Sequence, residues 1–225
     1  MILDARRDGG KNSARDKAVA FEFAHRERQH ALRDIANRTA NLIEAHGAPG
    51  EQFHDQHGPL VADPCRSLLL DLRDFPMPFF DQPATPAMPG RAPYKNEVVQ
   101  RWTAAVAQSD GFVFVTPEYN YGTSAVLKNA IDWVYPEWNR KAAGFVSYGS
   151  AMGARAVQQL RESAIEVQLA PIRSSVHIPV ATLWAHYTGG DVEAGLSELE
   201  TPAGAMIHDL LWWTAALKTA RAATR

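Results

Sequence analysis

The stretch that decides the fold is Gly111-Phe-Val-Phe-Val-Thr-Pro-Glu-Tyr-Asn-Tyr-Gly-Thr-Ser124. Residues 112–115 form a continuous run of aromatic and β-branched side chains, which is typical of a strand buried on both faces. Pro117 cannot donate to a sheet ladder, so we expect the chain to leave the sheet there. The Thr-Ser pair at the end can cap a helix predicted over residues 125–134. A strand, a loop and a helix in this order make half of a βαβ unit, and ligands often bind at such loops.

Strands and helices alternate on both sides of this stretch. Apolar runs predict five strands, near residues 2, 68, 112, 143 and 173, and helical spacing predicts helices over 14–46, 94–109, 154–169 and 202–222. Residues 75–93, with six prolines, and the acidic residues 181–201 are expected to lack regular structure. The pattern therefore predicts an α/β, flavodoxin-like three-layer fold with a five-stranded parallel sheet and a short first strand. The loops that follow the strands are expected along one rim of that sheet.

The bulk composition is that of an ordinary globular protein. The chain has 225 residues, 46% of them hydrophobic, with a formal net charge of −2, so no basic surface favours nucleic acid or membrane as a partner. The single Cys65 fits a reducing compartment, and the N-terminus has no signal-peptide core, so we expect a cytoplasmic location. We expect residues 1–66 to form a divergent N-terminal segment and residues 67–225 the flavodoxin-like domain, together one structural domain.

Four motifs follow one another along the chain. They are Asp-Leu-Arg-Asp-Phe-Pro-Met-Pro (71–78), Thr-Pro-Glu-Tyr-Asn (116–120), Leu-Lys-Asn-Ala-Ile-Asp-Trp (127–133) and Phe-Val-Ser-Tyr-Gly-Ser-Ala-Met-Gly-Ala-Arg-Ala (145–156). In this order and spacing they resemble the NAD(P)H-dependent FMN reductase family, of the azoreductase and quinone reductase type. The resemblance implies bound FMN and hydride transfer from NAD(P)H through the flavin to a quinone, azo, flavin or metal-ion acceptor. It also implies a homodimer or homotetramer.

The resemblance assigns two loops to the isoalloxazine ring of FMN. The matching positions are Pro117, Glu118, Tyr119 and Asn120 in the first loop, and Ser147, Gly149, Ser150 and Gly153 in the second. Glycines allow the backbone to approach a flat ring closely, and a proline stiffens the loop in advance of binding. Because the flavin would carry the redox chemistry, no catalytic side chain is expected.

The N-terminal loop departs from the family pattern. The family usually has a Gly-Ser-x-Arg-x-x-Ser-x-Asn-like run that holds the FMN phosphate at a helix N-terminus. Here Asp4 and Ala5 replace the Gly-Ser pair and Asp8 adds a negative charge, which leaves Arg7 and Ser13 as the candidate phosphate-binding residues. This departure keeps an alternative open, in which a flavodoxin-like protein has lost FMN binding and is non-catalytic or acts as a binding or scaffold module.

Two other patterns suggest chemistry less specifically. His54 and His57 flank a carboxylate in loop sequence, but no fourth ligand is evident, so we expect no metal site. Ser150 follows a strand as a hydrolase nucleophile does. However, Tyr148 and Met152 stand where a nucleophile elbow needs glycines, so a hydrolase is disfavoured.

Four tryptophans could cover a flavin or an interface: Trp138, Trp184, Trp212 and Trp213. Two of them carry expectations about burial. Trp138 lies in a connection between predicted elements and is a candidate for an interface. Trp213 lies on the C-terminal helix, which needs a buried face, so we expect it in the core.

Overall fold

A computed structural model of the chain describes residues 2–4 and 66–224. The strands are β1 (Ile2–Asp4), β2 (Arg66–Leu68), β3 (Gly111–Pro117), β4 (Ala142–Tyr148) and β5 (Ala170–His177). The helices are the 3-10 turn η1 (Leu72–Asp74), α2 (Glu97–Gln108), α3 (Ala125–Asp132), α4 (Ala154–Glu166), α5 (Val180–Thr188), α6 (Val192–Ser197) and α7 (Glu200–Ala223). The helix predicted over residues 14–46 lies outside the described residues.

The five strands form one sheet in the order β2-β1-β3-β4-β5. Strands β3, β4 and β5 are parallel, with Gly111 opposite Ala142. Strand β1, however, is antiparallel to both of its neighbours, so the prediction of an all-parallel sheet was wrong for this strand. An apolar run marks the position of a buried strand but reads the same in both directions, which is why the sequence did not reveal the reversal. Leu3 pairs with Gly111, the first residue of β3. Asp4 therefore lies at one rim of the sheet, and Pro117, at the end of β3, lies at the other rim.

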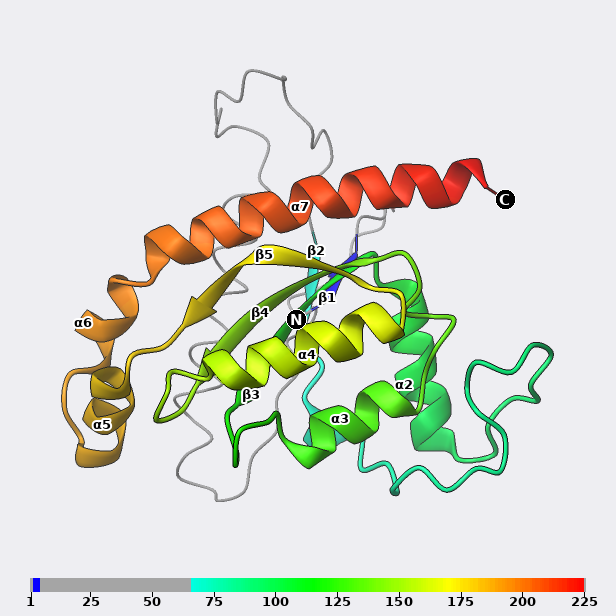
Figure 1. Cartoon of the computed structure of the whole chain (residues 1–225), viewed down its shortest axis with the longest axis horizontal. Helices are drawn as coiled ribbons and strands as arrows, with labels where there is room; N and C mark the ends of the chain where they lie inside the picture. Colours follow the sequence, from blue (N-terminus) through cyan, green and yellow to red (C-terminus); the bar gives the residue numbers. More distant parts are fainter. Residues whose placement is uncertain (1, 5–65, 225) are drawn as a thin grey trace, which may run out of the picture.

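Helices cover the two faces of the sheet and make a three-layer arrangement, as predicted. Figure 1 shows α7 running across one face, with α2, α3 and α4 on the other. Side chains of β3 alternate between the two cores: Phe112 and Phe114 pack toward α2–α4, and Val113 and Val115 pack toward α7. The complete burial of β3 and β4 follows from this double coverage.

Residues 181–201, which were predicted to lack regular structure, contain helices instead. Helix α5 ends at Gly189, which has the left-handed φ of 71° that a helix C-cap favours. Asp191 then caps α6, because its side chain accepts from the Ala194 N–H at 3.1 Å. The glycine that ends one helix and the aspartate that caps the next are recognisable helix signals in the sequence, although the acidic composition of the segment suggested a loop.

The two tryptophan expectations were both wrong. Trp138 is fully buried, with its indole N–H donating to the Ile131 carbonyl at 3.2 Å. Trp213 is 44% exposed, because the buried stripe of α7 passes beside it. That stripe consists of Ala203, Gly204, Met206, Ile207, Leu210, Leu211 and Thr214.

Strand β5 is an outer strand of the sheet and is irregular in its middle. Its register against β4 shifts between Ala143 and Phe145. In this stretch the Arg161 side chain of α4 donates to the Ile172 carbonyl at 3.1 Å and to the Arg173 carbonyl at 2.7 Å. The irregular part of the strand is therefore hydrogen-bonded to its own covering helix.

Candidate functional site

The loops that follow β3 and β4 lie against each other at the carboxyl ends of the two strands. The Glu118 N–H donates to the Tyr148 carbonyl at 2.8 Å, so the strand pairing continues one step into the loops. A Cβ added to Gly149 would lie 3.0 Å from the Glu118 Cβ, which shows how closely the two backbones approach. Two of the sequence-predicted segments therefore meet, as the prediction of a shared site requires.

A tight turn follows Glu118. Tyr119 and Gly122 exchange two backbone hydrogen bonds, of 2.9 and 3.0 Å. Asn120 and Tyr121 between them have φ angles of 48° and 78°. Two successive left-handed residues are the signature of a type I′ turn, in which asparagine is favoured and tyrosine is not. The turn leaves the rings of Tyr119 and Tyr121 exposed at the rim of the site.

The Glu118 side chain ties the first loop to the start of α4. Its carboxylate accepts from the Arg155 Nε at 2.5 Å and from the Arg155 backbone N–H at 3.1 Å. The Arg155 guanidinium in turn lies 4.2 Å from the centroid of the Tyr121 ring. The carboxylate is only 2% exposed, so it faces the protein and its charge is taken up by Arg155.

The ionisation of Glu118 depends on this arrangement. Burial alone would raise the pKa of Glu118, but the hydrogen bonds and the positive charge of Arg155 outweigh burial, and the pKa lies below its ordinary value of 4.5. Because the folded-state pKa is lowered, the carboxylate contributes stability above its ordinary pKa. That contribution is lost as the pH falls through the folded-state pKa.

We expect Glu118→Gln to reduce the free energy of unfolding near neutral pH by about 1–2 kcal/mol, since charge-assisted hydrogen bonds are stronger than neutral ones. The difference between wild type and variant should shrink as the pH is lowered from about 7 to about 3.5, in urea unfolding at each pH. Asp132→Asn is the control, because it removes an exposed ion pair with Lys128 and should cost less than about 0.5 kcal/mol. A difference for Glu118→Gln that does not vary with pH would contradict an ionic role.

The second loop is held from beneath by a buried serine. The Ser147 hydroxyl lies 2.9 Å from the Met152 carbonyl and 2.8 Å from His177 Nδ1, and the Ser147 side chain is fully buried. His177 also lies 2.9 Å from the Ser175 hydroxyl through Nε2. Ser147 can therefore support the loop but cannot touch a ligand through its side chain.

The loop needs glycine at its end. Gly153 has a φ of 76°, and a Cβ at this position would lie 2.5 Å from the Ser147 Cβ. The φ of 148° at Gly149 is equally unsuited to a side chain. The tight packing of the loop thus explains both glycines without reference to a ligand, and it leaves the backbone between them close to the first loop.

A cleft of about 230 Å³ opens between the two loops and α5. It is lined by Pro117, Glu118, Tyr119, Tyr148, Gly149, Ser150, Val180, Leu183, Trp184 and Tyr187. Within the described part of the chain, no hydrogen bond takes up the backbone N–H groups of Gly149 and Ser150. Such N–H groups beside a mostly apolar slot suit the polar edge of a flat ring, such as that of a flavin, so the residues present fit the ring end of FMN.

The remaining predicted residues divide into two groups. Asn120 lies in the exposed turn next to the cleft. Arg7 and Ser13, the phosphate candidates, lie outside the described residues, as do His54 and His57. Sequence reasoning missed Arg155, although it lies within the 145–156 motif, and it missed Tyr187 of α5. It named Trp184 only as one of four tryptophans that could cover a flavin or an interface.

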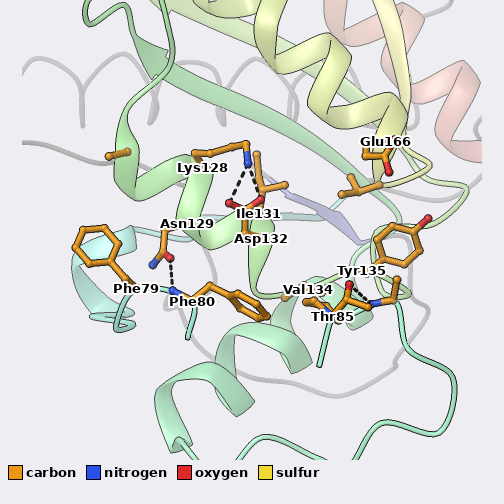
Figure 2. A pocket seen from close by; sticks show the side chains of 14 residues that line it. Phe79, Phe80, Thr85, Lys128, Asn129, Ile131, Asp132, Val134, Tyr135 and Glu166 are labelled. Carbon is orange, nitrogen blue, oxygen red and sulfur yellow. Dashed lines mark hydrogen bonds and ion pairs between the residues drawn. The ribbon is translucent and has the colours of Figure 1, made fainter. Parts of the chain in front are cut away.

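A larger hollow of about 690 Å³ lies elsewhere, between residues 79–87 and α3. In Figure 2 the Asn129 side chain points toward the Phe80 backbone, and the Lys128 and Asp132 side chains pair with each other. These polar groups already have hydrogen-bond or ion-pair partners within the protein. Neither of the two strand-end loops reaches this hollow. We therefore place the candidate site in the smaller cleft.

Comparisons with known proteins give a consistent picture. A model of the family "NADPH-dependent FMN reductase" matches residues 56–182. An NAD(P)H-dependent FMN reductase of Schizosaccharomyces pombe is 41% identical over 112 residues, covering 49% of this chain and 56% of that protein. An NAD(P)H:quinone oxidoreductase of Solanum tuberosum is 38% identical over 76 residues, 32% of this chain and 39% of that protein. The alignments thus span about half or less of these two relatives.

Solved structures share the fold. The flavoenzyme NAD(P)H:(acceptor) oxidoreductase FerB from Paracoccus denitrificans superposes with a TM-score of 0.57 at 19% identity, covering 88% of this chain and 95% of that one. This likeness confirms the fold class. No helix in the described residues combines the length and the apolar character needed to cross a membrane.

Proposed function

The chain belongs to the NADPH-dependent FMN reductase family, whose model matches more than half of it, and on this premise we propose that it is an FMN-dependent oxidoreductase. It uses NAD(P)H as co-substrate and reduces a small-molecule acceptor of the quinone, azo, flavin or metal-ion type. The observation that carries the proposal is the junction of the two strand-end loops, joined by the 2.8 Å hydrogen bond between Glu118 and Tyr148. The name of the potato relative, a quinone oxidoreductase, supports a quinone among the acceptors.

The protein's own part in this function is to bind and orient. FMN, when bound, supplies the two-electron redox chemistry. The N–H groups of Gly149 and Ser150 are the donors available to the polar edge of its ring, and Pro117 and Tyr119 form the wall beside them. The Glu118–Arg155 pair keeps the two loops in register, so the slot is formed before a ligand enters.

A flavin titration tests the proposal. We expect flavin-free protein to shift the visible absorbance spectrum of FMN, with a dissociation constant in the micromolar range or below. The loaded protein should then oxidise NAD(P)H when a quinone such as 1,4-naphthoquinone is added. A spectrum of FMN that stays unchanged over a full titration would remove the assignment.

A second candidate is a flavodoxin-like binding module that no longer holds FMN. The direction of β1 favours it, because Asp4 lies at the rim opposite the cleft, whereas a phosphate-binding loop normally follows a strand whose carboxyl end faces the site. Riboflavin, which lacks the phosphate, separates the candidates. A protein that holds the phosphate binds FMN more tightly than riboflavin. Equal affinities would mean that only the ring is held, and binding of neither flavin would support the second candidate.

Two finer expectations stay predictions. The homodimer or homotetramer implied by the family resemblance can be measured by sedimentation velocity. The cytoplasmic location can be checked by microscopy of a fluorescent fusion.

A further inference from the structure

Helix α5 presents one continuous face to the cleft. Its four lining residues are Val180, Leu183, Trp184 and Tyr187. Their spacing of three, four and seven residues from Val180 places them on one side of a helix. The two loops form the other side of the same cleft, so α5 is the wall opposite them.

The wall is fixed in place by α6 and the core. Thr182, on the far side of α5, is buried, and its hydroxyl occupies the space that a Cβ at Gly195 of α6 would need. Leu196 of α6 is part of the core beneath α7, and Leu183 packs against that core. A helix anchored in this way can hold side chains at a defined distance from the loops.

The wall is aromatic. Trp184 is 62% exposed and Tyr187 is 46% exposed, and their rings meet edge to face with centroids 6.0 Å apart. Among the residues that line the cleft, the only carboxylate is that of Glu118, and Arg155 takes up its charge. The space therefore favours a flat, largely apolar ring over a charged group. Its volume of about 230 Å³ suits one ring system and not an entire nucleotide.

We propose that Trp184 and Tyr187 are flavin-binding residues, which contact the isoalloxazine ring from the side opposite the two loops. The proposal rests on the proposed function, because it concerns the same cleft and the same cofactor. Trp184 and Tyr187 lie beyond the residues matched by the family model, so the aromatic part of this wall is outside the matched region.

Lumiflavin, which is the ring without the ribityl phosphate, is the probe that tests the proposal. Tryptophan in contact with a flavin ring quenches flavin fluorescence, so bound lumiflavin should be strongly quenched by the wild-type protein. We expect Trp184→Ala to weaken lumiflavin binding about 3- to 10-fold, as the loss of one aromatic contact predicts, and to recover part of the fluorescence of the bound ring. Tyr187→Ala should also weaken binding, whereas Tyr187→Phe, which keeps the ring, should not.

Trp212→Ala is the matched control, since Trp212 is also exposed but lies on α7 and does not line the cleft. It should leave affinity and quenching unchanged. Wild-type binding of lumiflavin with no change in Trp184→Ala would overturn the aromatic wall and leave the proposed function standing. Failure of the wild-type protein to bind either FMN or lumiflavin would overturn both.

Discussion

Gly153→Ala is expected to reduce the free energy of unfolding by about 2–5 kcal/mol and to weaken flavin binding. The left-handed φ of 76° costs an L-residue about 1–2 kcal/mol. The new methyl group would also lie 2.5 Å from the Ser147 Cβ and 2.7 Å from the Tyr148 backbone nitrogen, and overpacking of this kind costs about 1–3 kcal/mol. Ser147 cannot easily retreat because it is fully buried and hydrogen-bonded to the loop. Urea unfolding measures the loss.

The chain offers a close control for this substitution. Gly90 has a φ of 70°, but no atom lies within 4 Å of the position that its Cβ would take. Gly90→Ala should therefore show only the backbone cost, about 1–2 kcal/mol, and should bind flavin normally. The difference between the two variants isolates the collision with Ser147 and Tyr148. Equal losses would show that the loop moves aside without cost and that the close packing there is unimportant.

Trp138→Ala is expected to reduce the free energy of unfolding by about 3–5 kcal/mol. The indole is fully buried, lies edge to face with Phe112 at 4.7 Å between centroids, and donates to the Ile131 carbonyl. Its removal leaves a large cavity in the core between β3 and α3, and the Ile131 carbonyl keeps only its backbone partner, the Val134 N–H at 3.2 Å.

Trp213→Ala is the comparison for Trp138→Ala, because Trp213 is a tryptophan at the surface of α7. It should cost less than about 1 kcal/mol, measured in the same urea unfolding experiment. Similar losses for the two variants would contradict the burial described for Trp138.

Much of the fold could be predicted because β3 and β4 are continuous apolar runs, which are typical of strands buried on both faces. Strand β4 includes residue 143, near which a strand was predicted, and Ser124 caps α3 by accepting from the Leu127 N–H at 3.2 Å. The direction of β1 could not be predicted, since a strand of only three residues can pair with its neighbours in either direction. The burial of individual tryptophans depends on which side of a helix or connection meets the sheet, and sequence spacing alone leaves that choice open.

The two loops of the candidate site, which would contact a ligand through their backbone, could be predicted from the sequence. Proline, glycine and the strand ends located both loops, because those residues have few other uses at such positions. The α5 wall was not found, although its apolar residues recur at helical spacing, because the acidic residues around it suggested a loop. Ser147 was predicted as part of the loop beside the ring, but it lies near the end of β4 with its side chain buried beneath that loop. Sequence does not tell which face of a strand end points toward a ligand.

The irregular outer strand also bears on how molecules of this protein meet one another. A straight, open strand edge invites strand addition from a neighbouring chain, and aggregation begins there. In β5 the carbonyls of Ile172 and Arg173 already accept from Arg161, and Pro171 has no N–H to offer. These features make β5 a poor template for strand addition, and they act against aggregation at this edge of the sheet.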